Sequence, residues 1–295
     1  MAKQVLITGI NSYIGNSFER YVKEHYGDTL TISKTSLREN SWEEEDWSNY
    51  DAILHVAGIA HVDIQNADEA TQNQYFAVNT KLTHSAAAKA KAEGVGQFVF
   101  LSSMIVYGDA APVGKRKTIT AETEPAPANF YGESKLRAEG KLKELQDDAF
   151  HIAIVRPPFI YGPGCKGNYK KMASFARKMP VFPRIANERS MLYIENLTEL
   201  LAQIILQEKE GVFLPQNEAY VNTSEMVRSI AEVNGKTIRL IPGLGGFARI
   251  GAFFHPVFNK VFGTMVYDAA ASKVQGIDYQ KVDFGTSVRR SEGKA

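Results

Sequence analysis

Apolar, strand-like runs alternate with helix-forming segments through the first half of this 295-residue chain. Consecutive parallel strands need a long crossover, usually a helix, so this alternation predicts a parallel sheet covered by helices on both faces. We therefore predict an α/β fold with a doubly wound parallel sheet. The expected strands cover residues 4–8, 28–33, 52–56, 97–102 and 151–156, and the expected helices cover 14–26, 68–93 and 131–146.

A glycine-rich turn follows the first predicted strand, in the run 8–15 (TGINSYIG). Gly9 permits a tight turn, and Gly15 permits close packing of the helix on the strand. The helix N-terminus then offers unpaired N–H groups to a pyrophosphate. The run predicts a Rossmann-like dinucleotide site, with a plain strand–helix turn as the alternative. The predicted contacts are Gly9, Asn11, Ser12, Tyr13, Ile14 and Gly15.

The chain is expected to divide near residue 160. Residues 1–160 would form the dinucleotide-binding Rossmann domain. Beyond them, glycine- and proline-rich loops separate shorter helices, so residues 161–295 would form mainly a smaller substrate-binding region, with or without elements that return to the main sheet. The apolar stretch 242–266 is broken by glycine, proline, arginine and lysine. We expect it to be buried or to line a pocket, with a membrane-surface role as the alternative.

Composition excludes several other classes of protein. The net charge is +1 without a basic block, so nucleic acid is not an expected partner. The one cysteine, Cys165, excludes an internal disulfide and a cysteine-rich metal site. The six histidines show no metal-ligand spacing, and we predict no metal. No apolar stretch is long enough to span a bilayer, and no signal peptide is expected, which predicts a cytoplasmic protein.

The segment after the second strand predicts which dinucleotide is bound. Folds that bind NAD place Asp or Glu there to accept a hydrogen bond from the ribose 2′-hydroxyl. Here Ser33 and Lys34 end the strand, Arg38 follows, and no carboxylate occupies the tip. A hydroxyl and cations suit a 2′-phosphate, so these residues predict NADP(H), with NAD(H) as the alternative. A solvated turn without a role in cofactor choice is the other interpretation.

Tyr131 and Lys135 lie four residues apart in the run 131–135 (YGESK). On a helix this spacing places both side chains on one face. A nearby ammonium lowers the pKa of a phenol from its ordinary value of about 10. The pair therefore predicts a proton-transfer centre at a hydroxyl or carbonyl carbon, although the spacing also occurs by chance on amphipathic helices.

Several further segments resemble, in the same order, the extended short-chain dehydrogenases/reductases of the nucleotide-sugar epimerase/dehydratase type. The run 8–15 resembles the family pattern TGxxGxxG, with Ser12 in place of the middle glycine, which leaves less room for a pyrophosphate. The other matching segments are 56–62 (VAGIAHV), Asn79, 102–108 (SSMIVYG), 156–157 (RP), 161–164 (YGPG) and 189–194 (RSMLYI). These matches are collinear over residues 4–197.

The resemblance implies roles for individual residues. Tyr131 would be the proton donor or acceptor at the reacting sugar oxygen, and Ser103 would hydrogen-bond the same oxygen. Lys135 would lower the pKa of Tyr131 and hold the nicotinamide ribose, while Asn79 would order a water that connects to Lys135. The resemblance implies further cofactor contacts at Ala57, Gly58 and Pro158, and further substrate contacts at Met104, Asn168 and Arg189.

The two residues after Ser103 discriminate among the reactions of the family. Relatives that dehydrate at C5–C6 carry an Asp-Glu pair there, whereas this chain has Met104 and Ile105, which cannot transfer protons. Their apolar side chains would suit the C6 methyl group of a 6-deoxy sugar, unless both simply pack in the core. The resemblance thus implies an NAD(P)-dependent 4-ketoreductase that acts on a UDP-4-keto-6-deoxy-N-acetylhexosamine in bacterial polysaccharide precursor synthesis.

Two other functions stay open. A UDP-hexose 4-epimerase with bound NAD would use the same residues to oxidise C4 and return the hydride to its other face. A dinucleotide-binding sensor without chemistry is disfavoured by the presence of both Tyr131 and Lys135. The resemblance also implies a homodimer, in which the helices of Asn79 and Tyr131 form a four-helix bundle. The small residues 85–88 (SAAA) suit that interface and suit packing on the sheet equally well.

Overall fold

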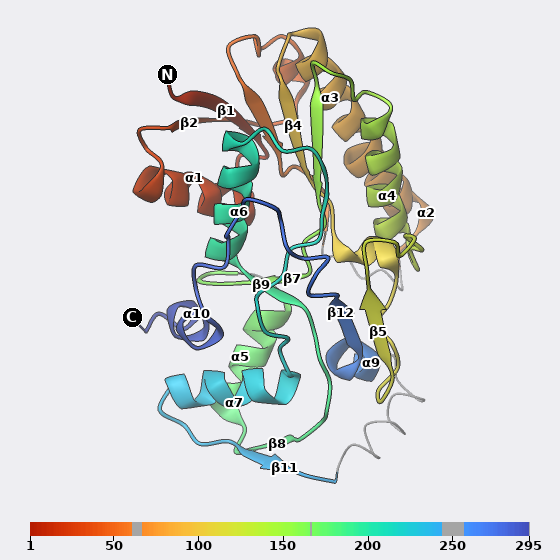
Figure 1. Cartoon of the computed structure of the whole chain (residues 1–295). Coiled ribbons are helices and arrows are strands. Elements are labelled where there is room, and N and C mark those ends of the chain that lie inside the picture. The colour runs from red at the N-terminus through yellow and green to blue at the C-terminus, as the bar shows by residue number, and fades with distance from the viewer. Residues whose placement is uncertain (61–66, 166, 244–256, 295) are drawn as a thin grey trace.

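The structure is a computed structural model that describes residues 1–60, 67–165, 167–243 and 257–294 (Figure 1). The described residues form a six-stranded parallel sheet in the order β10-β6-β4-β3-β1-β2. The strands are β1 (Lys3–Thr8), β2 (Leu30–Thr35), β3 (Ala52–His55), β4 (Gln97–Leu101), β6 (His151–Val155) and β10 (Gly211–Phe213). The order reverses between β1 and β3, where α/β folds bind ligands. The predicted doubly wound α/β fold is confirmed.

Helices cover both faces of the sheet (Figure 1). One face carries α1 (Tyr13–His25) and α6 (Ile194–Leu206), and the other carries α2 (Glu69–Phe76), η2 (Ala77–Leu82), α3 (Thr83–Ala92) and α4 (Phe130–Lys143). Successive residues of β1 alternate between two buried clusters. Val5 and Ile7 pack with Phe18 of α1, whereas Leu6 packs with Ala87 of α3. This alternation is the two-residue period of a strand buried on both faces.

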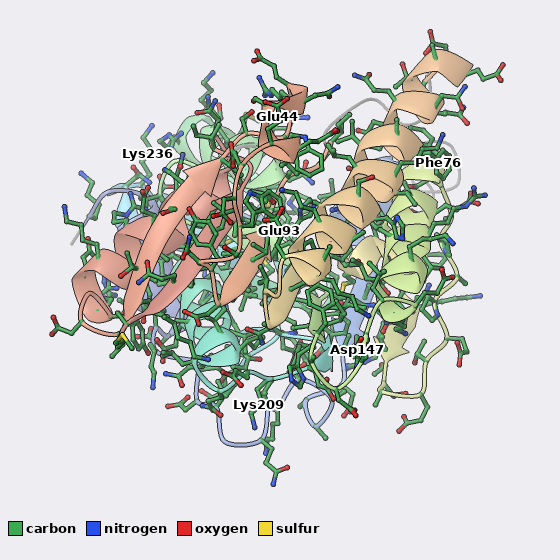
Figure 2. The ribbon with its side chains drawn as sticks, turned by 90° about the horizontal axis from the view of Figure 1, so that it is seen from above. Glu44, Phe76, Glu93, Asp147, Lys209 and Lys236 are labelled. Carbon is green, nitrogen blue, oxygen red and sulfur yellow. The ribbon has the colours of Figure 1, made fainter. Side chains whose placement is uncertain are left out.

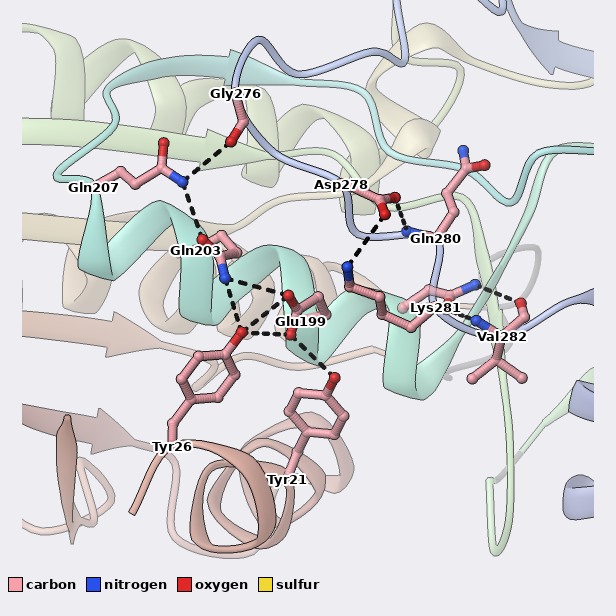
Figure 3. A network of polar contacts seen from close by, with 11 residues as sticks. Tyr21, Tyr26, Glu199, Gln203, Gln207, Gly276, Asp278, Gln280, Lys281 and Val282 are labelled. Atoms are coloured by element: carbon pink, nitrogen blue, oxygen red, sulfur yellow. Dashed lines mark hydrogen bonds and ion pairs between the residues drawn. The ribbon is translucent and has the colours of Figure 1, made fainter. Parts of the chain in front are cut away.

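A buried carboxylate joins the two helices on the first face (Figure 3). Glu199 of α6 accepts hydrogen bonds from Tyr21 (3.0 Å) and Tyr26 (2.8 and 2.9 Å), both from the α1 segment. Gln203, one helical turn further along α6, donates to the hydroxyl of Tyr26 at 2.8 Å. Although α6 and β10 follow residue 160, they therefore belong to the sheet and its helical cover. A division of the chain near that residue stays a prediction.

The short helix η1 (Asn40–Glu43) packs beside α3, because Trp42 shares a buried cluster with Ala87 and the side chain of Lys89 donates to the carbonyl of Glu43. The remaining elements lie beyond the carboxyl ends of the strands. They include η3 (Met104–Tyr107), α5 (Asn168–Lys178), α7 (Thr223–Val233), α9 (Val257–Phe262), α10 (Phe284–Ser291), and the strand pairs β5 (Arg116–Ile119) with β12 (Thr264–Tyr267), β7 (Phe159–Tyr161) with β9 (Met191–Tyr193), and β8 (Val181–Pro183) with β11 (Arg239–Ile241). Seen from above, Phe76 of α2 and Lys236 beyond α7 lie on opposite sides of the molecule (Figure 2).

Within the described part of the chain, no helix is long and apolar enough to cross a membrane. Most of the apolar stretch 242–266 lies outside the described residues; at its described end, Phe262, Met265 and Val266 are buried. The small side chains of α3 face the sheet, because Ala86 and Ala87 are fully buried in the cluster that contains Phe98 of β4. Packing on the sheet of the same protomer thus explains why these residues are small. The homodimer stays a prediction.

Candidate active site

Tyr131 and Ser103 meet where α4 begins. The side chain of Asn129 caps the helix by accepting a hydrogen bond from the N–H of Gly132 at 3.0 Å. A Cβ atom on Gly132 would lie 2.8 Å from the carbonyl oxygen of Ile105, closer than real Cβ contacts allow. Glycine at this position therefore lets the first turn of α4 approach η3, and the hydroxyl groups of Ser103 and Tyr131 are hydrogen-bonded.

Lys135 lies one turn further along α4 and is 6% exposed. Its Nζ donates to the carbonyl of Leu101 at 2.9 Å and lies 4.6 Å from the ring centroid of Phe100. A Cβ atom on Gly58 would lie 3.3 Å from this Nζ and 3.1 Å from Oδ1 of Asn79. The structure thus brings Gly58, Asn79 and Lys135 together at the carboxyl ends of β3 and β4.

Asn79 lies in a π-helical turn, η2, which interrupts the helix predicted for 68–93. Its Oδ1 accepts from the N–H of Ile59 at 2.8 Å. Its Nδ2 donates to the carbonyl of Ile59 and to Oγ of Ser134, both at 3.1 Å. Asn79 therefore ties the loop after β3 to the residue before Lys135, as π-turns often do at functional sites. The water-ordering role of Asn79 stays a prediction.

Burial dominates the titration of both central residues. It raises the pKa of Tyr131 to about 12; the nearby Tyr75 ring also raises it, and the hydrogen bond with Ser103 opposes the rise. It lowers the pKa of Lys135 to about 8, against the attraction of Glu139. Lys135 is not among the groups that shift the pKa of Tyr131 here, and its Nζ donates instead to the carbonyl of Leu101. The lowering of the Tyr131 pKa by Lys135 stays a prediction.

A buried ion pair behind α4 was missed in the sequence. Glu139 and Arg156 are 1% and 5% exposed, and Arg156 Nε lies 3.0 and 3.2 Å from the two carboxylate oxygens. Glu139 also accepts from the hydroxyl of Ser102, and Arg156 donates to the hydroxyl of Tyr107 at 2.6 Å. The pair thus connects α4 to both ends of the segment that carries Ser103. The sequence does hold one sign of this pair: Glu139 follows Lys135 by four residues, which places both side chains on the same face of a helix.

The glycine turn after β1 has the shape that a dinucleotide requires. Gly9 has a φ of +104°, and a Cβ there would lie 2.9 Å from the backbone nitrogen of Ala57. A Cβ on Gly15 lies 3.0 Å from Ile7, so the helix lies close against the strand. The turn therefore leaves room only for backbone between β1 and the loop after β3.

Ser12, which replaces the middle glycine of the family pattern, is the N-cap of α1. Its backbone is extended (φ −68°), so the position does not require glycine, and its hydroxyl accepts from the N–H of Gly15 at 3.4 Å. Within the described residues, the N–H groups of Tyr13 and Ile14 make no hydrogen bond. These groups fit a pyrophosphate, and Asn11 lies exposed beside them.

The end of β2 differs from the sequence prediction. Thr35, opposite Thr8, is the last residue of the strand and accepts from the N–H of Gly9 at 3.0 Å. Ser33 lies two residues inside the strand, and Lys34 Nζ forms an ion pair with Glu19 of α1 at 2.6 Å. Only Arg38 of the predicted phosphate contacts is exposed beyond the strand end. A carboxylate does reach this end, because Glu45 accepts from the hydroxyl of Thr35 at 2.7 Å.

The predicted substrate contacts are dispersed. Met104 is 8% exposed and packs in a cluster with Val106 and Tyr267, so its side chain fills the core. Its N–H donates to Pro157 at 2.9 Å, next to the buried Pro158. Asn168 is exposed at the first residue of α5. Burial lowers the pKa of Arg189, and its Nη1 lies 3.4 Å from the carbonyl of Val261.

A doubly wound sheet with a glycine turn at its switch point and a buried Tyr-Ser-Lys group beside it defines a dinucleotide-dependent oxidoreductase fold. A sequence model of the NAD dependent epimerase/dehydratase family matches residues 5–214, and the chain belongs to this family. It is an extended short-chain dehydrogenase/reductase of the kind that uses NAD(P) and acts on nucleotide sugars.

Individual relatives include both epimerases and reductases. UDP-glucose 4-epimerase from Vibrio cholerae is 30% identical over 89% of this chain and 83% of its own length. Among solved structures, UDP-N-acetylglucosamine 4-epimerase from Bacillus cereus has a TM-score of 0.76 at 15% identity and covers 99% of both chains. dTDP-4-dehydrorhamnose reductase from Bacillus anthracis, in complex with NADP, has a TM-score of 0.67 at 21% identity over 82% of this chain and 84% of its own. These structures share the fold.

Proposed function

We propose that this protein is a 4-ketoreductase that reduces a UDP-4-keto-6-deoxy-N-acetylhexosamine during bacterial polysaccharide precursor synthesis. The observation that carries this proposal is the placement of Tyr131 beside Ser103, in a segment where Met104 and Ile105 supply no second acid or base. A single phenol can donate the one proton that reduction of a ketone requires. Burial raises the pKa of Tyr131 to about 12, which supports its role as a proton donor.

The surroundings of Ser103 support ketone chemistry over dehydration. Elimination of water from a sugar needs a second acid or base next to the first. Directly after Ser103 stand Met104 and Ile105, and neither side chain can exchange a proton. Glu139, which contacts this segment through Ser102, is bound by the guanidinium of Arg156. This leaves Tyr131 as the proposed proton donor.

The residues of the chain would divide the work as follows. A nicotinamide dinucleotide, when bound at the turn 9–15, supplies the hydride that the side chains cannot. Tyr131 protonates the oxygen at C4, and Ser103 stabilises the charge that develops on it. Lys135, held beside Gly58 and Asn79, fixes the geometry of the group and orients the cofactor. Arg189 and Asn168 are the proposed contacts of the substrate diphosphate.

The test is an assay with purified protein, reduced nicotinamide cofactor and a UDP-4-keto-6-deoxy-N-acetylhexosamine. Loss of the absorbance of the reduced cofactor, together with a 4-hydroxy sugar product, is the expected result. Tyr131→Phe is the matched control because it removes only the hydroxyl. Unchanged turnover in this variant would show that Tyr131 is not the donor. Binding of cofactor without turnover of any sugar would favour a sensor.

A UDP-hexose 4-epimerase is the second candidate. The similarity to the Vibrio cholerae UDP-glucose 4-epimerase over most of both chains supports it. An epimerase interconverts UDP-hexoses without consuming added cofactor and retains its dinucleotide through purification. Incubation of the protein with UDP-glucose or UDP-N-acetylglucosamine alone separates the two functions, because a reductase leaves both sugars unchanged. Parallel assays with dTDP-sugars test the preference for UDP.

The proposed homodimer would pack α3 and α4 of one protomer against those of its partner. Arg137 and Lys141 of α4 are exposed, as an interface with a polar rim allows. Sedimentation of the purified protein at several concentrations tests this assembly. A monomer at all concentrations would reject it without affecting the proposed reaction.

A further inference from the structure

A carboxylate from a separate segment lies at the carboxyl end of β2. Glu45 follows η1, ten residues after Thr35 in the chain, and its Oε1 accepts a hydrogen bond from the Thr35 hydroxyl at 2.7 Å. The carbonyl of the same Thr35 accepts from the N–H of Gly9 at 3.0 Å. One residue therefore contacts both the glycine turn and the carboxylate, which places Glu45 beside the turn.

Glu45 is held in this place from two sides. Its Oε2 accepts from the indole N–H of Trp47 at 3.2 Å. Trp47 is fully buried, packs 5.7 Å from the ring of Trp42, and is tied through its backbone N–H to Glu93 of α3. A carboxylate oxygen has two lone pairs, so each oxygen of Glu45 keeps an acceptor site. The carboxylate is thus positioned by the fold and open to a further donor.

The cations nearby do not cancel this charge. Lys34 is engaged by Glu19 at 2.6 Å and by Oδ1 of Asn16 at 3.2 Å, on the α1 side of β2. Arg38 is exposed three residues beyond Thr35, and no salt bridge between Arg38 and Glu45 is found in the described part of the chain. The charge closest to the strand end is therefore negative.

We propose that Glu45 selects NAD(H) over NADP(H). In dinucleotide folds a carboxylate at the end of the second strand accepts from the ribose 2′-hydroxyl, and a 2′-phosphate there would be repelled. In this chain the strand ends in Thr35, which has no charge. Glu45 supplies the carboxylate instead, from the loop that follows η1. The inference rests on the proposed function only in assuming that the turn 9–15 binds a nicotinamide dinucleotide.

Direct binding tests the proposal without a sugar substrate. The fluorescence of NADH and of NADPH is titrated with wild-type protein, with Glu45→Gln, and with Glu44→Gln as the matched control. Glu44 is the exposed neighbouring carboxylate labelled in Figure 2. Wild type should bind NADH more tightly. Glu45→Gln should reduce the ratio of the two affinities by about tenfold or more, as loss of a charged hydrogen bond does, and Glu44→Gln should leave it unchanged.

A gain of function completes the test. Glu45→Arg should reverse the preference, because a guanidinium suits a 2′-phosphate. Tighter binding of NADPH by wild type, or an unchanged ratio in Glu45→Gln with unchanged thermal unfolding, would overturn the proposal. An equal shift in Glu44→Gln would also overturn it, since the effect would then be one of net charge. Failure of the reductase assay leaves these titrations intact, so the two proposals fail separately.

Discussion

Removal of the Glu139 charge should destabilise the protein strongly. Glu139→Gln keeps the shape of the side chain but leaves the guanidinium of Arg156, which is 5% exposed, without its anion. Breaking a buried pair from one side costs about 3–5 kcal/mol. Since domains of this kind are stable by about 5–15 kcal/mol, the change should be large in an unfolding experiment. The pair connects α4 to the Ser103 segment, so activity should fall as well.

Urea unfolding, monitored by circular dichroism, measures this cost. The urea concentration at the midpoint should fall, while the dependence of the unfolding free energy on urea concentration should stay unchanged. Glu133→Gln is a control on the same helix, because its pair with Arg137 is exposed and contributes less than about 1 kcal/mol. Glu139→Gln combined with Arg156→Met should be more stable than Glu139→Gln alone, since the orphaned charge is gone. A loss below about 1 kcal/mol in the single variant, or a double variant that is no better, would refute the reasoning.

Three further predictions concern single side chains. Tyr131→Phe should lower kcat by about 10²–10⁴-fold with little change in KM, measured in the ketone assay; a normal kcat would contradict it. His55 is buried and its pKa is lowered to about 3, below the unfolded value of about 6.5. The free energy of unfolding should therefore fall as the pH drops from about 6.5 toward 3, and this group should contribute up to about 1.4 kcal/mol per pH unit. Urea unfolding at several pH values measures the effect, and His55→Gln should remove this part of the pH dependence. Tyr13 Oη has no hydrogen-bond partner among the described residues, so Tyr13→Phe should leave stability unchanged or raise it by up to about 1 kcal/mol, and a clear loss would reveal a partner.

Local patterns predicted the sheet and its helices well. The apolar runs that became β1, β3 and β4 are buried on both faces, so their composition alone marked them as central parallel strands. The four-residue spacing of Tyr131 and Lys135 placed both on α4 because helical periodicity is a local property. The π-turn around Asn79 escaped prediction, since one extra residue in a turn leaves hydrophobic periodicity almost unchanged.

Contacts between distant segments could not be predicted from local pattern. The end of β2 looked free of carboxylates because Glu45 reaches it only through the packing of Trp47. Lys34 looked like a phosphate contact because its partner, Glu19, lies across the helix–strand interface. The pKa of Tyr131 depends most on how deeply its side chain is buried, and burial by other segments is not visible in a local pattern.

The most direct test of the central claim follows an isotope. Reduced cofactor deuterated at the transferring position is incubated with the protein and a UDP-4-keto-6-deoxy-N-acetylhexosamine, and the product is examined by mass spectrometry and NMR. If Tyr131 donates a proton while the cofactor reduces C4, the product carries deuterium at C4 and reduced cofactor is consumed in equal amount. Conversion of UDP-hexoses into their C4 epimers, without deuterium from added cofactor and without reduction of the ketone, would contradict the account.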